Sequence, residues 1–324
     1  MAYAESIVSG GHETAGRPRL FYTDGYELPL PAGHRFPIEK YRLLRELLEA
    51  DGGFSLEAAP LAEIASIELV HDAEYVRAFV EGKLDGAAMR RIGFPWSEGL
   101  VKRTLASVGS TLAATREALR RGWGGTLAGG THHAFRAEGS GYCVFNDIAV
   151  AIAWLRAERG MRRAAVVDLD VHQGDGTAEI FREDEDVLTL SVHCKENFPL
   201  RKQQSRIDVE LDARTGDEEY LRRLEDLLPR VRGFRPEIIF YQAGVDGLAE
   251  DRLGKLSLTL DGLKERDRQV MKLAAGCGVP LAITLGGGYA EPIRLTAEAH
   301  ANTFLTARET FGREEMGHER VESR

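Results

Sequence analysis

Residues 166–175 read VVDLDVHQGD, an apolar run that passes directly into three carboxylates and an imidazole. The apolar part, with the two alanines before it, is typical of a strand that is buried on both faces of a sheet. The acidic part has three possible explanations: a metal site, a polar loop that happens to be acidic, or an acid/base pair. Features elsewhere in the chain decide between them.

Short apolar runs alternate with amphipathic helical patterns along the chain. We expect strands at 19–23, 66–71, 125–129, 164–170, 187–193, 237–244 and 280–286, and helices at 37–50, 73–82, 97–122, 146–160, 218–231 and 263–276. This alternation predicts an α/β fold, a mostly parallel sheet covered by helices on both faces. No repeat or linker divides residues 1–324, so we expect a single domain with a polar, frayed tail at 313–324.

Composition excludes several classes of function. The 324 residues carry a formal charge of −9, so the chain lacks the basic footprint of a nucleic-acid-binding protein. No apolar run is long enough to cross a bilayer, and no signal peptide is expected at the N-terminus. Cys143, Cys194 and Cys277 form no CxxC pair, which indicates free thiols and a cytoplasmic location rather than disulfides or thiolate-bound zinc.

Four of the expected strands end in chemically capable residues. VVDLD runs into VHQGD, GTLAG into GTHHAF, IIFYQAG into VDGLAED, and AITL into GGGYA. In open parallel sheets, ligands bind beyond the carboxyl ends of the strands. The coincidence of four such ends favours a catalytic site over an acidic loop.

The metal explanation rests on the spacing of Asp170 and His172. They are two residues apart, so in an extended segment their side chains point the same way and can bind one ion. Asp246, just after the strand at 237–244, is the natural third ligand. Two carboxylates, a neutral imidazole and an open position suit one catalytic Zn²⁺ per chain, although other divalent ions fit the same ligands.

Two carboxylate ligands would largely cancel the charge of zinc, so the site also needs a general base. His132 and His133, which follow a Gly-Gly turn, are the candidates. The remaining acids, Asp168 and Asp175, can each orient a histidine and raise its basicity. Tyr289, after three glycines, can donate to a developing oxyanion. Together these groups are the parts needed for metal-assisted amide hydrolysis.

Five separated motifs resemble those of the zinc-dependent histone deacetylase family, in the same order and spacing: GGTHHAF, SGYCVFNDIAVA, VVDLDVHQGDGT, GVDGLAEDRLG and LGGGYA. The resemblance covers nearly the whole chain and implies the arginase-deacetylase fold. Gln173 and the stretches PLPAGHRFPIEKYRLL and SVHCKENFP are most similar to the class IV branch and to bacterial histone deacetylase-like amidohydrolases.

The resemblance implies a role for each matching residue. The zinc ligands would be Asp170, His172 and Asp246. The catalytic groups would be His132 with Asp168 behind it, His133 with Asp175 behind it, and Tyr289 as the phenol that polarises the acyl carbonyl. An acyl-lysine tunnel would be lined by Gly141, Tyr142, Phe198 and Leu253. A potassium ion would be held by the side chains of Asp168 and Ser191 and by the backbone carbonyls of Asp170, His172 and Val192.

The expected reaction is hydrolysis of Nε-acyl-lysine, with an acetyl or longer acyl group, in a protein or peptide. Deacetylation of acetylpolyamines or other small amines is chemically close. A binuclear manganese amidinohydrolase would need further carboxylates in a DxD pattern, where GVDGLAED offers Asp246 alone and Asp251 lies too far on to bridge easily. A non-catalytic acyl-lysine binder would not need every catalytic position filled by a competent residue.

Overall fold

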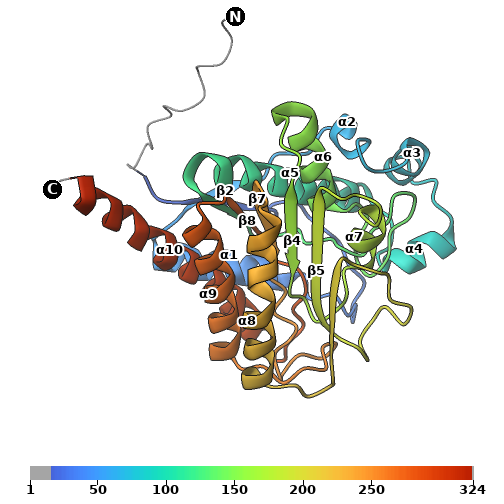
Figure 1. Ribbon diagram of the computed structural model, residues 1–324. Coiled ribbons are helices and arrows are strands. Elements are labelled where there is room, and N and C mark those ends of the chain that lie inside the picture. The colour runs from blue at the N-terminus through green and yellow to red at the C-terminus, as the bar shows by residue number, and fades with distance from the viewer. Residues whose placement is uncertain (1–15, 323–324) are drawn as a thin grey trace, which may run out of the picture.

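The computed structural model describes residues 16–322, with side chains through residue 312. Eight strands form one sheet in the order β2-β1-β3-β8-β7-β4-β5-β6, and every pairing between them is parallel (Figure 1). The expected α/β fold with a parallel sheet is therefore confirmed. The strands are β1 (Arg19–Tyr22), β2 (Ser55–Ala58), β3 (Trp123–Thr126), β4 (Ala164–Asp168), β5 (Val187–Cys194), β6 (Ile207–Leu211), β7 (Ile238–Gln242) and β8 (Leu281–Thr284).

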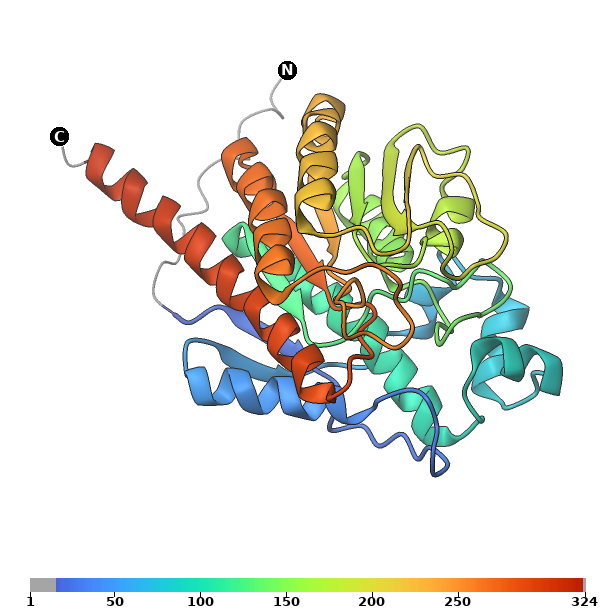
Figure 2. The same cartoon turned by 90° about the horizontal axis from the view of Figure 1, so that it is seen from below.

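Ten helices are described, and they cover both faces of the sheet. They are α1 (Glu39–Asp51), α2 (Ile64–Ile67), α3 (Ala73–Val80), α4 (Gly86–Ile92), α5 (Glu98–Arg121), α6 (Asp147–Arg159), α7 (Asp175–Ile180), α8 (Asp217–Phe234), α9 (Leu260–Cys277) and α10 (Ile293–Glu322). On one face, α1, α10, α9 and α8 lie side by side in that order (Figure 2). On the other face, α5 packs against α6.

Strand β4 shows why two helical layers are needed. Successive side chains of a strand point to opposite faces. Ala165 and Val167 belong to the core beneath α1, α8, α9 and α10, while Ala164 and Val166 belong to the core beneath α5 and α6. All four side chains are buried. A strand that is apolar on both faces is stable only when helices cover both faces of the sheet.

The segment 66–71 is not a strand, contrary to expectation. Residues 64–67 form α2 and the next residues turn, with Ile67 and Val70 buried and Leu69 exposed between them. A spacing of three residues suits a helical turn, so the apolar residues of SIELVH have been assigned the wrong period. The sheet is completed instead by β2 and β6, which the sequence does not reveal. Six of the seven expected strands and all six expected helices are present.

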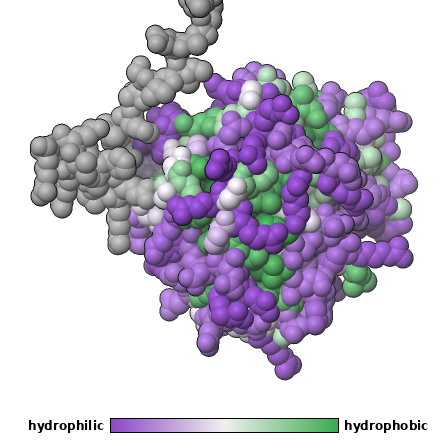
Figure 3. Space-filling model, in the orientation of Figure 1, coloured by the Kyte–Doolittle hydropathy of each residue, from purple (hydrophilic) through white to green (hydrophobic). Residues whose placement is uncertain are grey.

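At the C-terminus, α10 continues to Glu322, so the backbone from 313 to 322 is helical where a frayed tail is expected. The N-terminal residues 1–15, in which no signal peptide is expected, lie outside the described part. No helix within residues 16–322 is both long and apolar enough to span a membrane. The face drawn in Figure 3 is largely hydrophilic, with hydrophobic residues reaching the surface in narrow strips between polar ones.

The sheet order explains how the site forms. The four strands whose ends carry polar motifs are β3, β8, β7 and β4, and these are four consecutive neighbours in the sheet. Because these strands all run parallel, their carboxyl ends lie along the same side of the sheet, the side at which the strands end. The loops that follow these four strands therefore meet at the middle of that side.

Candidate active site

Asp170, His172 and Asp246 form a cluster that could hold one metal ion. The Nδ1 atom of His172 lies 3.0 Å from Asp170 Oδ1 and 3.1 Å from Asp246 Oδ2. All three side chains are buried. Burial and the charge of Asp170 raise the pKa of the Asp246 carboxyl to about 7. A divalent cation would relieve this repulsion, so the ligand set fits a metal that prefers nitrogen and oxygen donors.

Backbone amides and glycines hold the two carboxylates in place. Gly287 N donates to Asp170 Oδ2 at 2.7 Å, and Val171 N donates to Asp246 Oδ1 at 2.8 Å. A Cβ atom on Gly287 would lie 1.9 Å from Asp246 Oδ2. The second glycine of GGGYA is therefore needed so that the backbone can approach the metal ligands.

His132 and His133 meet their predicted partners. His132 Nδ1 lies 2.7 Å from Asp168 Oδ2, and His133 Nδ1 lies 2.6 Å from Asp175 Oδ1. The two Nε2 atoms lie 3.1 Å apart and both histidines line the same pocket. The carboxylates that the sequence leaves outside the metal site are thus the ones behind the histidine pair.

The two imidazoles differ in acidity. Burial opposes the charge on His132, but the carboxylates of Asp168 and Asp170 outweigh it and raise the pKa of His132 to about 9. Burial and the charge of His132 lower the pKa of His133 to about 4, although Asp175 acts in the opposite direction. At neutral pH the pair thus contains one charged and one neutral imidazole. A cation bound by Asp170 would cancel part of the attraction on His132.

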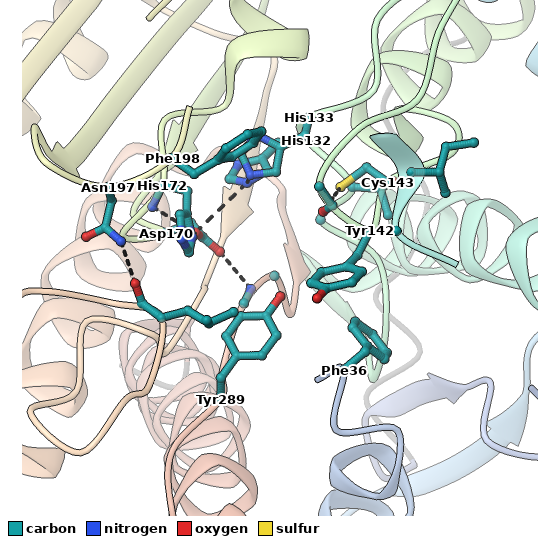
Figure 4. Close-up of a pocket in the computed structure, with 18 of the residues that line it drawn as sticks. Phe36, His132, His133, Tyr142, Cys143, Asp170, His172, Asn197, Phe198 and Tyr289 are labelled. Atoms are coloured by element: carbon teal, nitrogen blue, oxygen red, sulfur yellow. Dashed lines mark hydrogen bonds and ion pairs between the residues drawn. The ribbon is translucent and has the colours of Figure 1, made fainter. Parts of the chain in front are cut away.

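Tyr289 faces the histidine pair across the pocket (Figure 4). Burial and the charges of Asp246 and Asp170 hold the pKa of its phenol well above the ordinary value, so the phenol stays protonated. Its backbone amide donates to Asp251 Oδ2 at 2.6 Å. Asp251 therefore orients the tyrosine loop rather than the metal.

The four predicted tunnel residues, Gly141, Tyr142, Phe198 and Leu253, all line this pocket of about 480 Å³. Figure 4 shows Tyr142 and Phe198 on its walls. Phe198 packs edge-on against His133, with 4.9 Å between ring centroids. Gly141 has a φ of +53°, and a Cβ there would lie 2.7 Å from a ring carbon of His133. Tyr142 also adopts a positive φ, 67°, which is uncommon for an aromatic residue.

Ser191 lies opposite Asp168 in the pairing of β4 with β5. Both side chains are buried, and Ser191 Oγ lies 2.9 Å from His193 Nδ1. The two side chains expected to bind potassium are therefore on adjacent strands.

Two positioning residues are not evident from the sequence. Asp147, the first residue of α6, accepts hydrogen bonds from Gly130 N (2.9 Å), Thr131 N (2.7 Å) and the Thr131 hydroxyl (2.6 Å). It holds the turn that precedes the histidine pair. Lys40 on α1 is 1% exposed, and its ammonium lies 5.1 Å from the Tyr289 ring centroid and 3.3 Å from the Gly288 carbonyl. Asp147 lies in the SGYCVFNDIAVA motif, whereas Lys40 has no local signal.

Comparisons with known proteins show which family the chain belongs to. The sequence profile of the histone deacetylase domain matches residues 34–304. The chain is 44% identical over 303 residues to an uncharacterized protein of Picosynechococcus sp., covering 91% of this chain and 100% of that protein. It is 31% identical to histone deacetylase 2 of Arabidopsis thaliana, covering 83% of this chain and 74% of the relative.

A third relative is the histone deacetylase-like amidohydrolase of Pseudomonas aeruginosa, 30% identical over 81% of this chain and 74% of that protein. The matched residues 34–304 include every metal-cluster, histidine-pair and tunnel residue described above. The chain therefore belongs to the histone deacetylase family of the arginase-deacetylase superfamily, a generally metal-dependent family of amide-hydrolysing deacetylases.

Proposed function

We propose that this chain is a zinc-dependent hydrolase that removes acyl groups from Nε-acyl-lysine. The observation that carries the proposal is the arrangement around His172 Nδ1, which lies 3.0 and 3.1 Å from the carboxylates of Asp170 and Asp246. Beside this cluster stand two histidines, each paired with its own carboxylate. Such a combination supports metal-assisted hydrolysis more than metal storage or a structural ion.

Zinc held by Asp170, His172 and Asp246 would supply a Lewis acid for the acyl carbonyl and lower the pKa of a water molecule. His133 can accept a proton at Nε2, because its depressed pKa of about 4 keeps it neutral at physiological pH. Protonated His132, beside it, is a proton donor for the leaving amine. Asp175, bonded to Nδ1, fixes the tautomer of His133 in which Nε2 is the proton acceptor.

The phenol of Tyr289 can donate a hydrogen bond to the oxygen of the acyl group as negative charge develops on it. Lys40 supports this role, since its ammonium contacts the same tyrosine ring and the carbonyl of Gly288. The tunnel walls formed by Tyr142 and Phe198 suit the apolar stem of an acyl-lysine side chain.

One observation disfavours a binuclear manganese amidinohydrolase. Asp251, the extra acid of GVDGLAED, already accepts hydrogen bonds from the amides of Leu253 and Gly254 at 2.8 Å and from Tyr289 at 2.6 Å. Within the described side chains, the cluster of Asp170, His172 and Asp246 is the one group found that could hold a metal. A second ion would lack a comparable ligand set.

Metal analysis and an acyl-lysine panel test the proposal together. Purified protein should contain about one zinc per chain. It should release the carboxylic acid from at least one peptide in a series bearing acetyl, butyryl and long-chain acyl groups, leaving a free lysine side chain in the peptide, and a chelator should abolish this hydrolysis. Two manganese ions per chain would support the amidinohydrolase instead. A zinc-loaded protein without activity on any of these peptides would contradict the lysine deacylase assignment.

Two further parts of the proposal concern a potassium ion and the location of the enzyme in the cell. A potassium ion beside Asp168 and Ser191 is supported by their adjacent positions on β4 and β5. A cytoplasmic location is supported by the three free cysteines, of which Cys143 and Cys194 are buried.

A further inference from the structure

The entrance of the pocket is positively charged, although the whole chain carries −9. Arg90, Arg91 and Lys255 line the pocket, and Glu196 is the one carboxylate outside the catalytic cluster that lines it among the described residues. Arg91 is paired with Glu138 at 3.0 Å. For Arg90 and Lys255 no carboxylate partner is found among the side chains through residue 312. We call the part of the pocket lined by Arg90, Arg91 and Lys255 the mouth.

Among the described side chains, Glu196 forms no ion pair with Arg90 or Lys255. Its carboxylate accepts hydrogen bonds from the Ala213 amide (3.1 Å) and the Cys194 thiol (3.2 Å), and it pairs with Lys195 at 3.9 Å. Lys255 donates instead to the backbone carbonyl of Glu196 at 2.8 Å. The ammonium of Lys255 therefore keeps its charge available to a ligand.

The wall beside Lys255 is held in a defined shape. Lys202 donates to the carbonyls of Asn197 and Pro199, both at 2.7 Å. The side chain of Gln173, next to the metal ligand His172, bonds both the carbonyl (2.7 Å) and the amide (2.8 Å) of Gln203. These bonds close the segment 197–203 into a loop anchored to the catalytic centre.

This anchored loop displays apolar side chains to solvent. Phe198 is 41% exposed although it lines the pocket, and Leu200 is 93% exposed. A free small amine that enters the tunnel would leave Leu200 uncovered. A polypeptide that carries the acyl-lysine can contact both side chains while the lysine stem occupies the tunnel.

We propose that the mouth binds polypeptides in which acidic residues flank the acyl-lysine. Arg90 and Lys255 come from two different walls of the pocket, since residues 91–92 bond the Gly141–Tyr142 turn and Lys255 bonds Asn197 and Glu196. Carboxylates on either side of the acyl-lysine can therefore pair with them, whereas the ammonium groups of a polyamine are repelled. This inference rests on the proposed lysine deacylase activity and specifies its substrate class.

The test uses zinc-loaded enzyme and three peptides that are identical except for Glu, Gln or Lys on both sides of the acyl-lysine, with N-acetylspermidine as the fourth substrate. The acyl group is the one found most active in the panel. We expect kcat/KM to fall in the order Glu, Gln, Lys, with about a three- to tenfold step from Glu to Gln, mainly through KM. The differences in kcat/KM between the peptides should be smaller at about 500 mM NaCl than at about 50 mM NaCl, because salt screens exposed charges.

Variants of the mouth residues test whether these residues cause the preference for Glu-flanked peptides. The double variant Arg90→Gln/Lys255→Gln should bring the Glu-to-Gln ratio of kcat/KM close to one, and Arg90→Glu/Lys255→Glu should favour the Lys-flanked peptide. Arg230→Gln removes an exposed cation from the end of α8 that leads toward the start of β7, and it should leave the ratio unchanged.

Equal kcat/KM for the three peptides in the wild type would overturn this inference alone, because the deacylase activity would stand. A ratio that survives in the double variant, or a higher kcat/KM for N-acetylspermidine than for the peptides, would overturn it too. No turnover of any acyl-lysine peptide would overturn the proposed function itself.

Discussion

The two histidine–aspartate pairs of the site share their geometry and differ in their chemistry. The Nδ1 atoms lie 2.7 and 2.6 Å from the carboxylates of Asp168 and Asp175, and both histidines are buried. Yet the pKa of His132 is raised to about 9, while that of His133 is lowered to about 4. A carboxylate behind a histidine therefore does not by itself set its protonation state.

The difference comes from the next neighbours. Burial disfavours the charged form of both rings, but His132 also lies 3.9 Å from Asp170 Oδ1. His133 lies against His132 instead, and two imidazoles whose Nε2 atoms are 3.1 Å apart resist being charged together. The first proton thus goes to His132, which leaves His133 neutral and able to act as a base.

The largest expected effect comes from removing His133, the neutral histidine of the two. His133→Ala removes the proposed base, so kcat should fall by about 10²–10⁴-fold. His132→Ala removes the proposed proton donor for the leaving amine, which water can partly replace, and leaves the proposed base in place with a less depressed pKa, so kcat should fall less. Steady-state kinetics on the same acyl-lysine peptide, with metal content measured for each variant, makes the comparison. Equal losses in kcat would contradict the division of roles.

Tyr289→Phe tests the opposite side of the pocket, where a phenol rather than an imidazole would face the acyl group of the proposed substrate. We expect kcat to fall by about 10²–10³-fold with KM changed less than about threefold, because the hydrogen bond strengthens only as charge develops. Tyr26→Phe is the matched control, since that hydroxyl donates to the Ala59 carbonyl and does not line the pocket. Equal losses in kcat and in substrate affinity would argue against an oxyanion role.

A smaller effect should come from the two aspartates behind the histidines. Asp168→Asn and Asp175→Asn should each reduce kcat by about 10–100-fold while the metal stays bound, because orientation and basicity are weakened but no ligand is lost. Asp170→Asn, measured alongside by metal analysis, should instead lower the metal content. Loss of metal from Asp168→Asn to the same degree would mean that this acid supports the metal site directly.

The arrangement of the candidate site could be predicted from the sequence because its signals are local. The Asp170–His172 spacing, the paired histidines and the strand-end positions each depend on a few neighbouring residues and on the rule for parallel sheets. The structure brings these groups together at the ends of β3, β8, β7 and β4, in the expected arrangement.

The features that the sequence does not reveal depend on distant contacts. Lys40 lies within an amphipathic helical pattern, where a lysine is normally solvated, yet it is buried against the glycine loop almost 250 residues further on. Strands β2 and β6 lie at the two edges of the sheet, where β2 has no fully buried side chain and β6 buries only Ile207 and Leu211. Their side chains are partly exposed, so neither gives the apolar run that marks the central strands.

His71 provides a buried histidine without a carboxylate partner, against which both pairs can be compared. Its Nδ1 donates to the Arg136 carbonyl (3.3 Å), and its Nε2 accepts from the Asn146 amide (2.8 Å). Burial lowers its pKa to about 4, and the backbone hydrogen bonds offset this only in part. The folded protein therefore holds His71 neutral, as it does His133, but with no acid opposing the shift.

The smallest predicted effect follows from this depressed pKa. Because the folded pKa of His71 lies below the unfolded value of 6.5, its contribution to stability is complete above pH 6.5 and is lost as the pH falls toward 4. Relative to His71→Gln, the wild type should lose about 2 kcal/mol of unfolding free energy between pH 7.5 and about pH 5. Urea denaturation of both proteins at the two pH values measures this difference. A constant difference would mean that His71 titrates alike in the folded and unfolded chain and would contradict a pKa depressed by burial.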